Sequence, residues 1–184
     1  SRKVPLPFMV LATQNPLEQE GTYPLPEAEL DRFLIKVVIQ FPSVADEIRL
    51  TKLITQGQVG DNNSIANIKP VVTAAELIEY QQQVADLAID DQVVDYAVRI
   101  VRATRNHPSI FRGAGSRASI GLVRIAKANA FLEGRQFVLP DDVKNLAIAV
   151  LQHRIALTPD VEIEGLSAGD VLQQLLQDVE APRQ

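Results

Sequence analysis

The sequence has no cysteine and only two histidines among its 184 residues. Without cysteine, disulfides and thiolate metal sites are excluded. The absence of disulfides is typical of cytoplasmic proteins. No apolar run approaches the roughly 20 residues that a membrane-spanning helix needs, and the first residues lack the apolar stretch of a secretory signal. We therefore expect a cytoplasmic protein that does not insert into a membrane, and no metal ligand among its residues.

The chain is also short of positive charge, because 18 lysines and arginines face 23 acidic residues and the net charge is -5. Sequence-independent binding to nucleic acids depends on neutralising phosphates with basic side chains. We therefore predict no nucleic-acid partner. Hydrophobic residues make up 46% and charged residues 22%, which is the balance of a globular protein rather than a disordered one.

Two apolar runs near the start, residues 8–12 and 33–39, show no polar alternation. Such runs are typical of strands that are buried on both faces of a parallel sheet. A helical turn is predicted between them, at residues 27–31. Strands without sheet neighbours leave backbone groups unpaired, so we expect residues 1–42 to pair with another copy or with sequence outside this chain. A chain that opens on a core strand has the appearance of a piece of a longer protein.

After Pro42 the pattern changes to helices, because apolar residues recur at helical spacing. Thr73 and Glu76 form the sequence signature of a capping box. The predicted class is α+β and predominantly α, with two strands in residues 1–42 and a helical bundle in residues 43–184. Helices are predicted at residues 43–56, 73–86, 90–106, 116–134, 140–151 and from 167 onward, with a short extended piece at 160–164.

Asn15 lies just past the end of the first predicted strand, residues 8–12. Ligands of open α/β sheets bind at the carboxyl ends of strands, and an amide placed there is able to orient a water molecule. The alternative is that Thr13 and Asn15 only shape a turn, as an Asn-Pro pair often does.

Arg32 stands just before the second predicted strand. A guanidinium group is permanently charged and binds phosphate oxygens in a fork, so Arg32 is a candidate for stabilising phosphoryl transfer. The alternative is an ordinary surface ion pair with Asp31 or Glu29.

Arg117 lies in the first turn of a predicted helix, after the small residues 113–116. Backbone N–H groups and the helix dipole attract anions to such a helix start. An arginine there has the wrong sign for the dipole, which an anion nearby would compensate. The alternative is a flexible loop with a solvated arginine.

These segments together resemble the MoxR family of AAA+ ATPases over about residues 7–157. The resemblance is carried by FMVLATQNP, GTYPLPEA and LDRF at residues 8–16, 21–28 and 30–33, and by GSRA, PDDV and VLQHR at residues 115–118, 140–143 and 150–154. The later motifs are similar to the helical lid of that family. One departure is Ser116, where the family usually has proline.

The resemblance implies three roles. Asn15 would be sensor 1, which positions the attacking water; Arg32 would be the arginine finger, which reaches the ATP of the neighbouring subunit; and Arg117 would be sensor 2, which links the lid to the nucleotide. It further implies a homo-oligomeric ring, a hexamer, that uses ATP and Mg²⁺ to remodel or activate client proteins in the manner of a chaperone, with the lid swinging about residues 41–43.

The sequence contains no Gly-x-x-x-x-Gly-Lys-Ser/Thr loop and no apolar run that ends in Asp-Glu. The groups that grip the phosphates and Mg²⁺ are therefore expected outside these residues, and this chain alone is not expected to hydrolyse ATP. The alternative function is a non-catalytic helical module for protein interaction.

Overall fold

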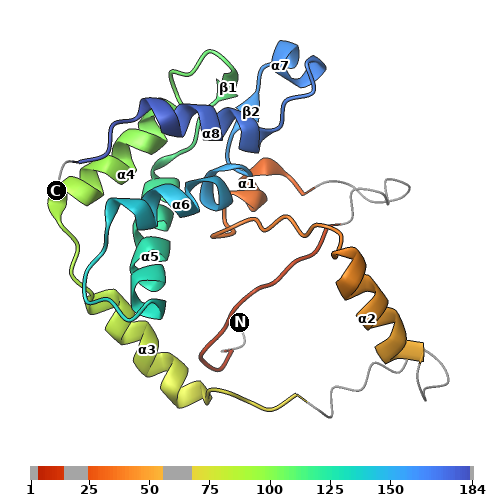
Figure 1. Cartoon of the computed structure of the whole chain (residues 1–184). Coiled ribbons are helices and arrows are strands. Elements are labelled where there is room, and N and C mark those ends of the chain that lie inside the picture. Colours follow the sequence, from red (N-terminus) through yellow and green to blue (C-terminus); the bar gives the residue numbers. More distant parts are fainter. Residues whose placement is uncertain (1–3, 15–24, 56–67, 183–184) are drawn as a thin grey trace.

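The computed structural model describes residues 4–14, 25–55 and 68–182. The helices are α1 (Glu27–Leu30), α2 (Val44–Thr55), α3 (Ala74–Asp86), α4 (Asp91–Ala103), α5 (Ser116–Leu132), α6 (Pro140–Leu151), α7 (Pro159–Ile163) and α8 (Ala168–Asp178), and the strands are β1 (Ile110–Arg112) and β2 (Ala156–Leu157). Figure 1 shows most helices gathered on one side, while α2 and the extended segment of residues 4–14 lie on the other.

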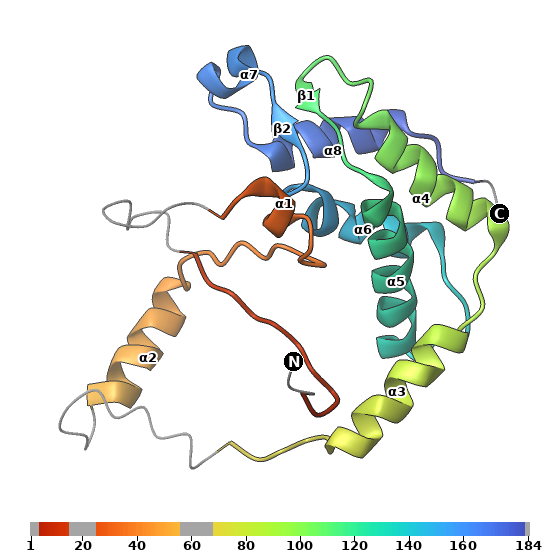
Figure 2. The same cartoon turned by 180° about the vertical axis from the view of Figure 1, so that it is seen from behind.

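The hydrophobic core lies between α4, α5, α6 and α8, which pack against one another (Figure 2). Each of these helices contributes large side chains that are fully buried, among them Tyr96, Ile100, Leu122, Leu151 and Leu172. Their spacing of three or four residues along each helix places them on one face. The predominantly helical class is therefore confirmed, and the buried core begins at Leu87, after α2 and α3, which have no buried residue.

Several helix ends are fixed by capping residues that can be recognised in the sequence. Thr73 forms the predicted capping box with Glu76, and the Asp90 carboxylate accepts the N–H of Gln92 at 2.7 Å. Helix α5 ends at Leu132 and is followed by Gly134, whose φ of 72° favours glycine, and the N–H of Arg135 reaches back to the carbonyl of Ala130 at 2.9 Å.

Asp142 joins the end of α5 to the start of α6. Its carboxylate is almost fully buried and accepts hydrogen bonds from Arg135 at 2.6 and 2.7 Å, from Asn129 at 2.8 Å and from the N–H of Leu139 at 2.8 Å. Although burial raises the pKa of Asp142, these donors outweigh it and hold the pKa below its usual value. Asp142 is thus a helix-start acid, as its position after Pro140 indicates.

Among the described residues the sheet consists of β1 and β2, which pair antiparallel with Ile110 opposite Leu157. The class is α+β and predominantly α, as predicted, but the strands are not where the sequence placed them. Residues 8–12 and 33–39 form no strand, and residues 33 and 34 are bends. A strand requires a neighbouring strand for its backbone groups, and none pairs with these runs in the part of the chain that is described; the N–H of Lys36 donates instead to the carbonyl of Ala149 in α6.

The extended piece predicted at residues 160–164 is also wrong, because α7 covers residues 159–163. Pro159 occupies the first helical position and acidic residues fill the first turn, both of which favour a helix start. The alternation of Val161 and Ile163 with acidic residues imitates the pattern of a strand.

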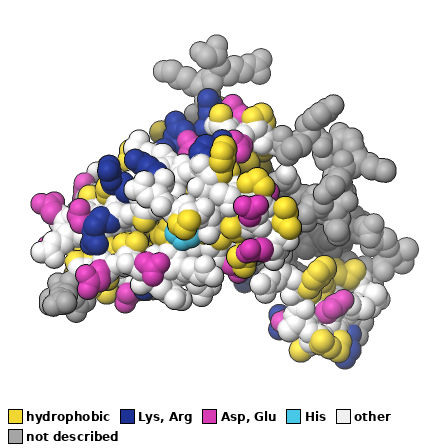
Figure 3. Space-filling view, turned by 90° about the horizontal axis from the view of Figure 1, so that it is seen from above, with side chains coloured by type: hydrophobic (Ala, Val, Ile, Leu, Met, Phe, Trp, Pro, Cys, Tyr) yellow, Lys and Arg dark blue, Asp and Glu magenta, His cyan; other side chains and the backbone are white. Residues whose placement is uncertain are grey.

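Helix α2 stands apart from the bundle in both views and has no buried residue (Figures 1 and 2). Figure 3 shows the molecule from above, and hydrophobic side chains lie exposed on the part of the surface that α2 forms. Ser43 caps this helix, and its hydroxyl oxygen accepts the N–H of Asp46 at 3.2 Å. No described helix combines the length and the apolar character needed to cross a membrane.

Candidate functional site

The turn that carries Arg32 follows α1 and is closed by backbone hydrogen bonds. The N–H of Asp31 donates to Glu27 at 2.9 Å, and the N–H of Arg32 donates to Glu29 at 3.1 Å. The predicted helical turn at residues 27–31 is therefore confirmed. We name residues 31–34 the finger turn, after the arginine-finger role that the family resemblance implies for Arg32. Asn15, the third predicted site residue, lies outside the described residues.

The Arg32 side chain points into solvent, with 69% of it exposed. Its nearest acidic partner is Glu29, with 3.8 Å between Nε and Oε2, and Glu29 is itself half exposed. An exposed pair at this separation contributes about 0–1 kcal/mol to stability. The guanidinium group is therefore accessible to a ligand or to another subunit.

Arg117 lies in the first turn of α5 and forms an ion pair with Asp31. Helix α5 has no acidic residue in its first turn, so Asp31 supplies the negative charge that the helix dipole favours there. The anion that the sequence led us to expect beside Arg117 is thus, in this structure, a carboxylate of the finger turn. The Arg117 side chain remains 59% exposed.

A second arginine that sequence reasoning did not single out holds the same turn. The Arg154 side chain is 2% exposed, and its Nε donates to the Asp31 carboxylate at 3.2 Å. Its Nη2 donates to the carbonyl oxygens of Phe33 at 2.5 Å and Asp31 at 3.3 Å. Its Nη1 donates to the carbonyl oxygens of Val150 at 2.6 Å and Leu34 at 3.1 Å. Burial lowers the pKa of Arg154 and the charge of Asp31 opposes this, but an arginine keeps its proton in either case.

His153 adds a further contact to the finger turn. Its Nε2 lies 3.0 Å from the carbonyl oxygen of Phe33, and since a carbonyl only accepts, Nε2 carries the proton. The other ring nitrogen, Nδ1, is buried and has no partner among the described residues. Burial lowers the pKa of His153, so the ring is neutral near pH 7. This histidine is thus a half-buried, neutral contact of the finger turn.

The start of α1 is tied down as well, because Glu27 forms an ion pair with Arg112 of β1. The hydrogen bond from Arg112 lowers the pKa of the Glu27 carboxyl. Further along, the N–H of Lys36 donates to Ala149 at 2.8 Å, and Gln152 donates to the carbonyl of Lys36 at 2.7 Å. The segment from Glu27 to Lys36 is therefore fixed to the bundle at several points, while the Arg32 side chain remains exposed.

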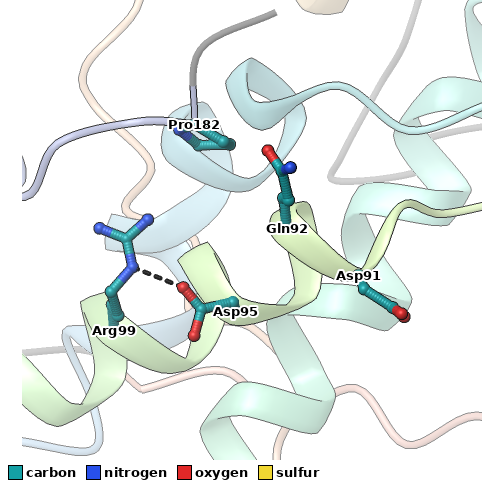
Figure 4. A pocket seen from close by; sticks show the side chains of 5 residues that line it. All are labelled: Asp91, Gln92, Asp95, Arg99 and Pro182. Carbon is teal, nitrogen blue, oxygen red and sulfur yellow. Dashed lines mark hydrogen bonds and ion pairs between the residues drawn. The ribbon is translucent and has the colours of Figure 1, made fainter.

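Two surface hollows lie away from these arginines. One, of about 420 Å³, is lined by Asp91, Gln92, Asp95, Arg99 and Pro182, and an ion pair of 2.7 Å between Asp95 and Arg99 occupies its wall (Figure 4). The other, of about 550 Å³, runs along β2 beside Glu27 and Glu162. Neither is lined by Arg32, Arg117 or Arg154, and both carry carboxylates that repel phosphate.

No cluster of three or more metal-ligating side chains occurs within residues 4–14, 25–55 and 68–182. The described part of the site thus offers arginines and backbone groups, which suit an anionic ligand and the stabilisation of negative charge.

Comparisons with known proteins give a family match for each of the two parts of the chain that contribute residues to this site. Residues 102–175 match the family model described as the AAA lid domain, and residues 1–35 match that of the ATPase family associated with various cellular activities. The matched ranges contain Arg117 and Arg154 on one side and Asn15 and Arg32 on the other.

Similar proteins have comparable sequences over nearly the whole chain. Uncharacterized protein YeaC of Bacillus subtilis is 40% identical over 97% of this chain and 54% of its own length, and Chaperone MoxR1 of Mycobacterium tuberculosis is 36% identical over 98% and 48%. The crystal structure of a "putative ATPase" from Cytophaga hutchinsonii matches 99% of this chain and 56% of its own, with a TM-score of 0.88 and 34% identity. The chain spans about half the length of the curated relatives it matches.

Proposed function

Because the chain belongs to the MoxR family of AAA+ ATPases, we propose that it is the C-terminal part of a ring-forming enzyme that hydrolyses ATP to remodel or activate client proteins. A chaperone-like role is supported by the relative from Mycobacterium tuberculosis, which is named as a chaperone. In this proposal residues 1–42 belong to the nucleotide-binding core and residues 43–184 form the lid. The ring is a cytoplasmic homo-hexamer whose clients are proteins and not nucleic acids.

Arg32 is the arginine finger of this proposal, and the observation that carries it is the exposure of its guanidinium group on a turn held by the lid. A finger has to extend from its own subunit to reach the ATP of the next one. In GTPases, an arginine supplied in this way accelerates phosphoryl transfer by about 10³–10⁵-fold. Asn15 is proposed as sensor 1, which orients the attacking water in the subunit's own site.

Arg117 is sensor 2 of this proposal, and its place beside the finger turn suggests which nucleotide it serves. Its ion-pair partner, Asp31, directly precedes Arg32 in the chain. We therefore propose that both arginines act on the same nucleotide, that of the neighbouring subunit. The terminal phosphates of that ATP compete with Asp31 for Arg117, since both are oxygen anions.

ATP is the proposed substrate and Mg²⁺ its companion ion. Residues outside this chain are proposed to hold the metal and most of the triphosphate, because the sequence has neither a phosphate-gripping loop nor an Asp-Glu strand end. The described residues supply charge at the edge of the site, through Arg32 and Arg117.

A second candidate function is a non-catalytic module for protein interaction. It is favoured by the exposed apolar side chains of α2, such as Val44 at 76% and Leu53 at 70%, together with the missing loop. The two candidates differ in whether Arg32 affects ATP turnover.

The test measures steady-state ATP hydrolysis by the full-length protein with single substitutions. Arg32→Ala and Arg117→Ala are expected to lower kcat strongly, while Arg124→Ala, an exposed arginine on the same helix as Arg117, leaves it unchanged. Loss of charge opposite the transferred phosphate raises the barrier of the chemical step. Wild-type turnover in Arg32→Ala would remove the finger assignment and favour the interaction module.

A further inference from the structure

We infer that Arg154 is a positioning residue, which fixes the lid to the finger turn and so sets the placement of both Arg32 and Arg117. This inference rests on the proposed function, in which these two arginines act on the nucleotide of a neighbouring subunit. Arg154 itself touches no nucleotide in this account, because its side chain is 2% exposed.

The backbone on both sides of Arg32 is held by one guanidinium group. The carbonyl of Asp31, just before Arg32, accepts from Nη2 of Arg154 at 3.3 Å, and the carbonyl of Phe33, just after it, accepts from the same nitrogen at 2.5 Å. The Arg32 side chain has only the loose 3.8 Å approach to Glu29 among its described charge partners. The direction in which Arg32 extends is therefore set by its backbone, and Arg154 fixes that backbone to the end of α6.

The carboxylate of Asp31 connects the same guanidinium group to Arg117. One oxygen of Asp31 accepts from Nε of Arg154 at 3.2 Å, and the other pairs with Arg117. Asp31 is thus oriented from its buried side and presents its second oxygen to the arginine at the start of α5. The positions of Arg32 and Arg117 therefore both depend on Asp31, which Arg154 holds in place.

The chemistry of this contact requires arginine and not merely a positive charge. Arg154 uses all three of its nitrogens to reach four backbone carbonyls and one carboxylate. A lysine has three donors on a single atom and cannot satisfy acceptors arranged around a planar fork. Arg154→Lys therefore keeps the charge and loses the geometry, which separates positioning from electrostatics.

The first experiment compares Arg154→Gln and Arg154→Lys in the full-length protein. Displacement of catalytic groups by about 1 Å costs roughly 10²-fold in rate, so kcat is expected to fall by about 10- to 100-fold in both variants. KM for ATP is expected to change less than kcat, because the Arg32 contact forms at the transition state and residues outside this chain hold most of the triphosphate. Wild-type kcat in Arg154→Lys would contradict the inference.

The second experiment mixes variant subunits, which shows at whose site Arg154 acts. Asn15→Ala impairs a subunit's own site and retains its finger, whereas Arg32→Ala impairs the finger and retains the subunit's own site. Rings that contain Arg154→Gln and Asn15→Ala subunits are expected to regain ATP hydrolysis, and rings that contain Arg154→Gln and Arg32→Ala subunits are not. The opposite pattern would place the effect of Arg154 in its own subunit's site and overturn the inference.

The pair of Arg32→Ala and Asn15→Ala separates this failure from failure of the proposed function. If that pair does not regain activity, the finger does not act between subunits, and the inference falls with it. If that pair does regain activity and Arg154→Gln with Asn15→Ala does not, the inference alone is wrong.

Hydrogen exchange of the backbone amides reports the contact without ATP hydrolysis. In Arg154→Gln, exchange at residues 31–36 is expected to accelerate, while the core of α4 stays protected. Protection of residues 31–36 equal to that of the wild type would overturn the inference. If the Gln variant does not fold, the Lys variant takes its place in the mixing and exchange experiments.

Discussion

The helical bundle and the described residues before it, 4–14 and 25–55, differ in how their apolar side chains are covered. In the bundle, Tyr96, Leu122 and Leu172 are completely buried, whereas in the first region Leu11 is 82% and Ile39 is 90% exposed. Both regions are rich in apolar residues, so the difference lies in whether other residues of the chain cover them. The finger turn is where the two regions meet, because Asp31, Phe33 and Leu34 bind to Arg154 of the bundle.

Because of this difference, we expect the bundle to determine the stability of the protein and the finger turn to determine its proposed activity. The bundle buries a core of apolar side chains, and such burial stabilises a fold by about 25 cal/mol per Å² removed from water. The finger turn contributes little burial but displays the charge that the proposed reaction needs. Substitutions in the two regions should therefore affect different measurements.

The largest expected effect is on rate, in Arg32→Ala. ATP hydrolysis by the full-length protein should fall by about 10³-fold or more, in line with arginine fingers elsewhere. Its free energy of unfolding should stay within about 0.5 kcal/mol of wild type, because the side chain is exposed and makes only one loose ion pair. Parallel ATPase assays and urea melts measure both. A destabilised Arg32→Ala protein would show that the turn depends on this side chain for its structure.

The next effect is on stability, in Leu122→Ala. Leu122 is fully buried between the helices, so its truncation should lower the free energy of unfolding by about 2–5 kcal/mol in urea denaturation. The matched control is Leu53→Ala in α2, where the side chain is 70% exposed and the expected change is within about 0.5 kcal/mol. Equal losses at the two positions would show that α2 is covered by a partner, such as another copy in a ring.

A smaller effect is expected where the two regions join, in Asp31→Asn. This change leaves the buried Arg154 without its carboxylate, and we expect a loss of about 1–3 kcal/mol, with partial exposure of Asp31 reducing the cost. Asp95→Asn, which breaks an exposed ion pair with Arg99, serves as the control and should cost at most about 1 kcal/mol. Thermal melts of the two proteins compare them. A loss no larger than that of Asp95→Asn would indicate that the backbone carbonyls alone stabilise Arg154.

The smallest effect concerns pH. Because burial lowers the pKa of His153 below 6.5, the unfolded state takes up a proton before the folded state does. The stability that depends on neutral His153 is present above about pH 6.5 and is lost as the pH falls through 6.5 toward the lowered pKa. Stability measured between pH 7.5 and 5 should therefore fall, and His153→Gln should flatten this slope. An unchanged slope in the variant would assign the loss to other groups.

The helices of the bundle were predictable because their signals are local. Thr73 with Glu76 and Ser167 with Asp170 mark helix starts within four residues of sequence, and apolar spacing marks the buried faces. The prediction of strands at residues 8–12 and 33–39 was wrong. A strand forms only beside a neighbouring strand, and a run of apolar residues does not specify that neighbour.

The candidate site was predicted in part. The sequence pointed to Arg32 and Arg117 as candidates, and it offered an ion pair between Arg32 and Asp31 or Glu29 as the alternative. In the structure Arg32 approaches Glu29 at 3.8 Å. Asp31 forms its ion pairs with Arg117 and Arg154 instead. Arg154 was missed because its partner Asp31 lies 123 residues away along the chain, and a single sequence carries no sign that a given arginine is buried.

ATP hydrolysis in mixed rings of Arg32→Ala and Asn15→Ala subunits tests the central claim most directly. Neither variant alone is expected to turn over ATP at an appreciable rate. In a head-to-tail ring with equal and random mixing, about one quarter of the subunit interfaces join an intact site to an intact finger. We therefore predict recovery of roughly that fraction of wild-type activity. A mixture no more active than its two components assayed separately would contradict an arginine finger at Arg32.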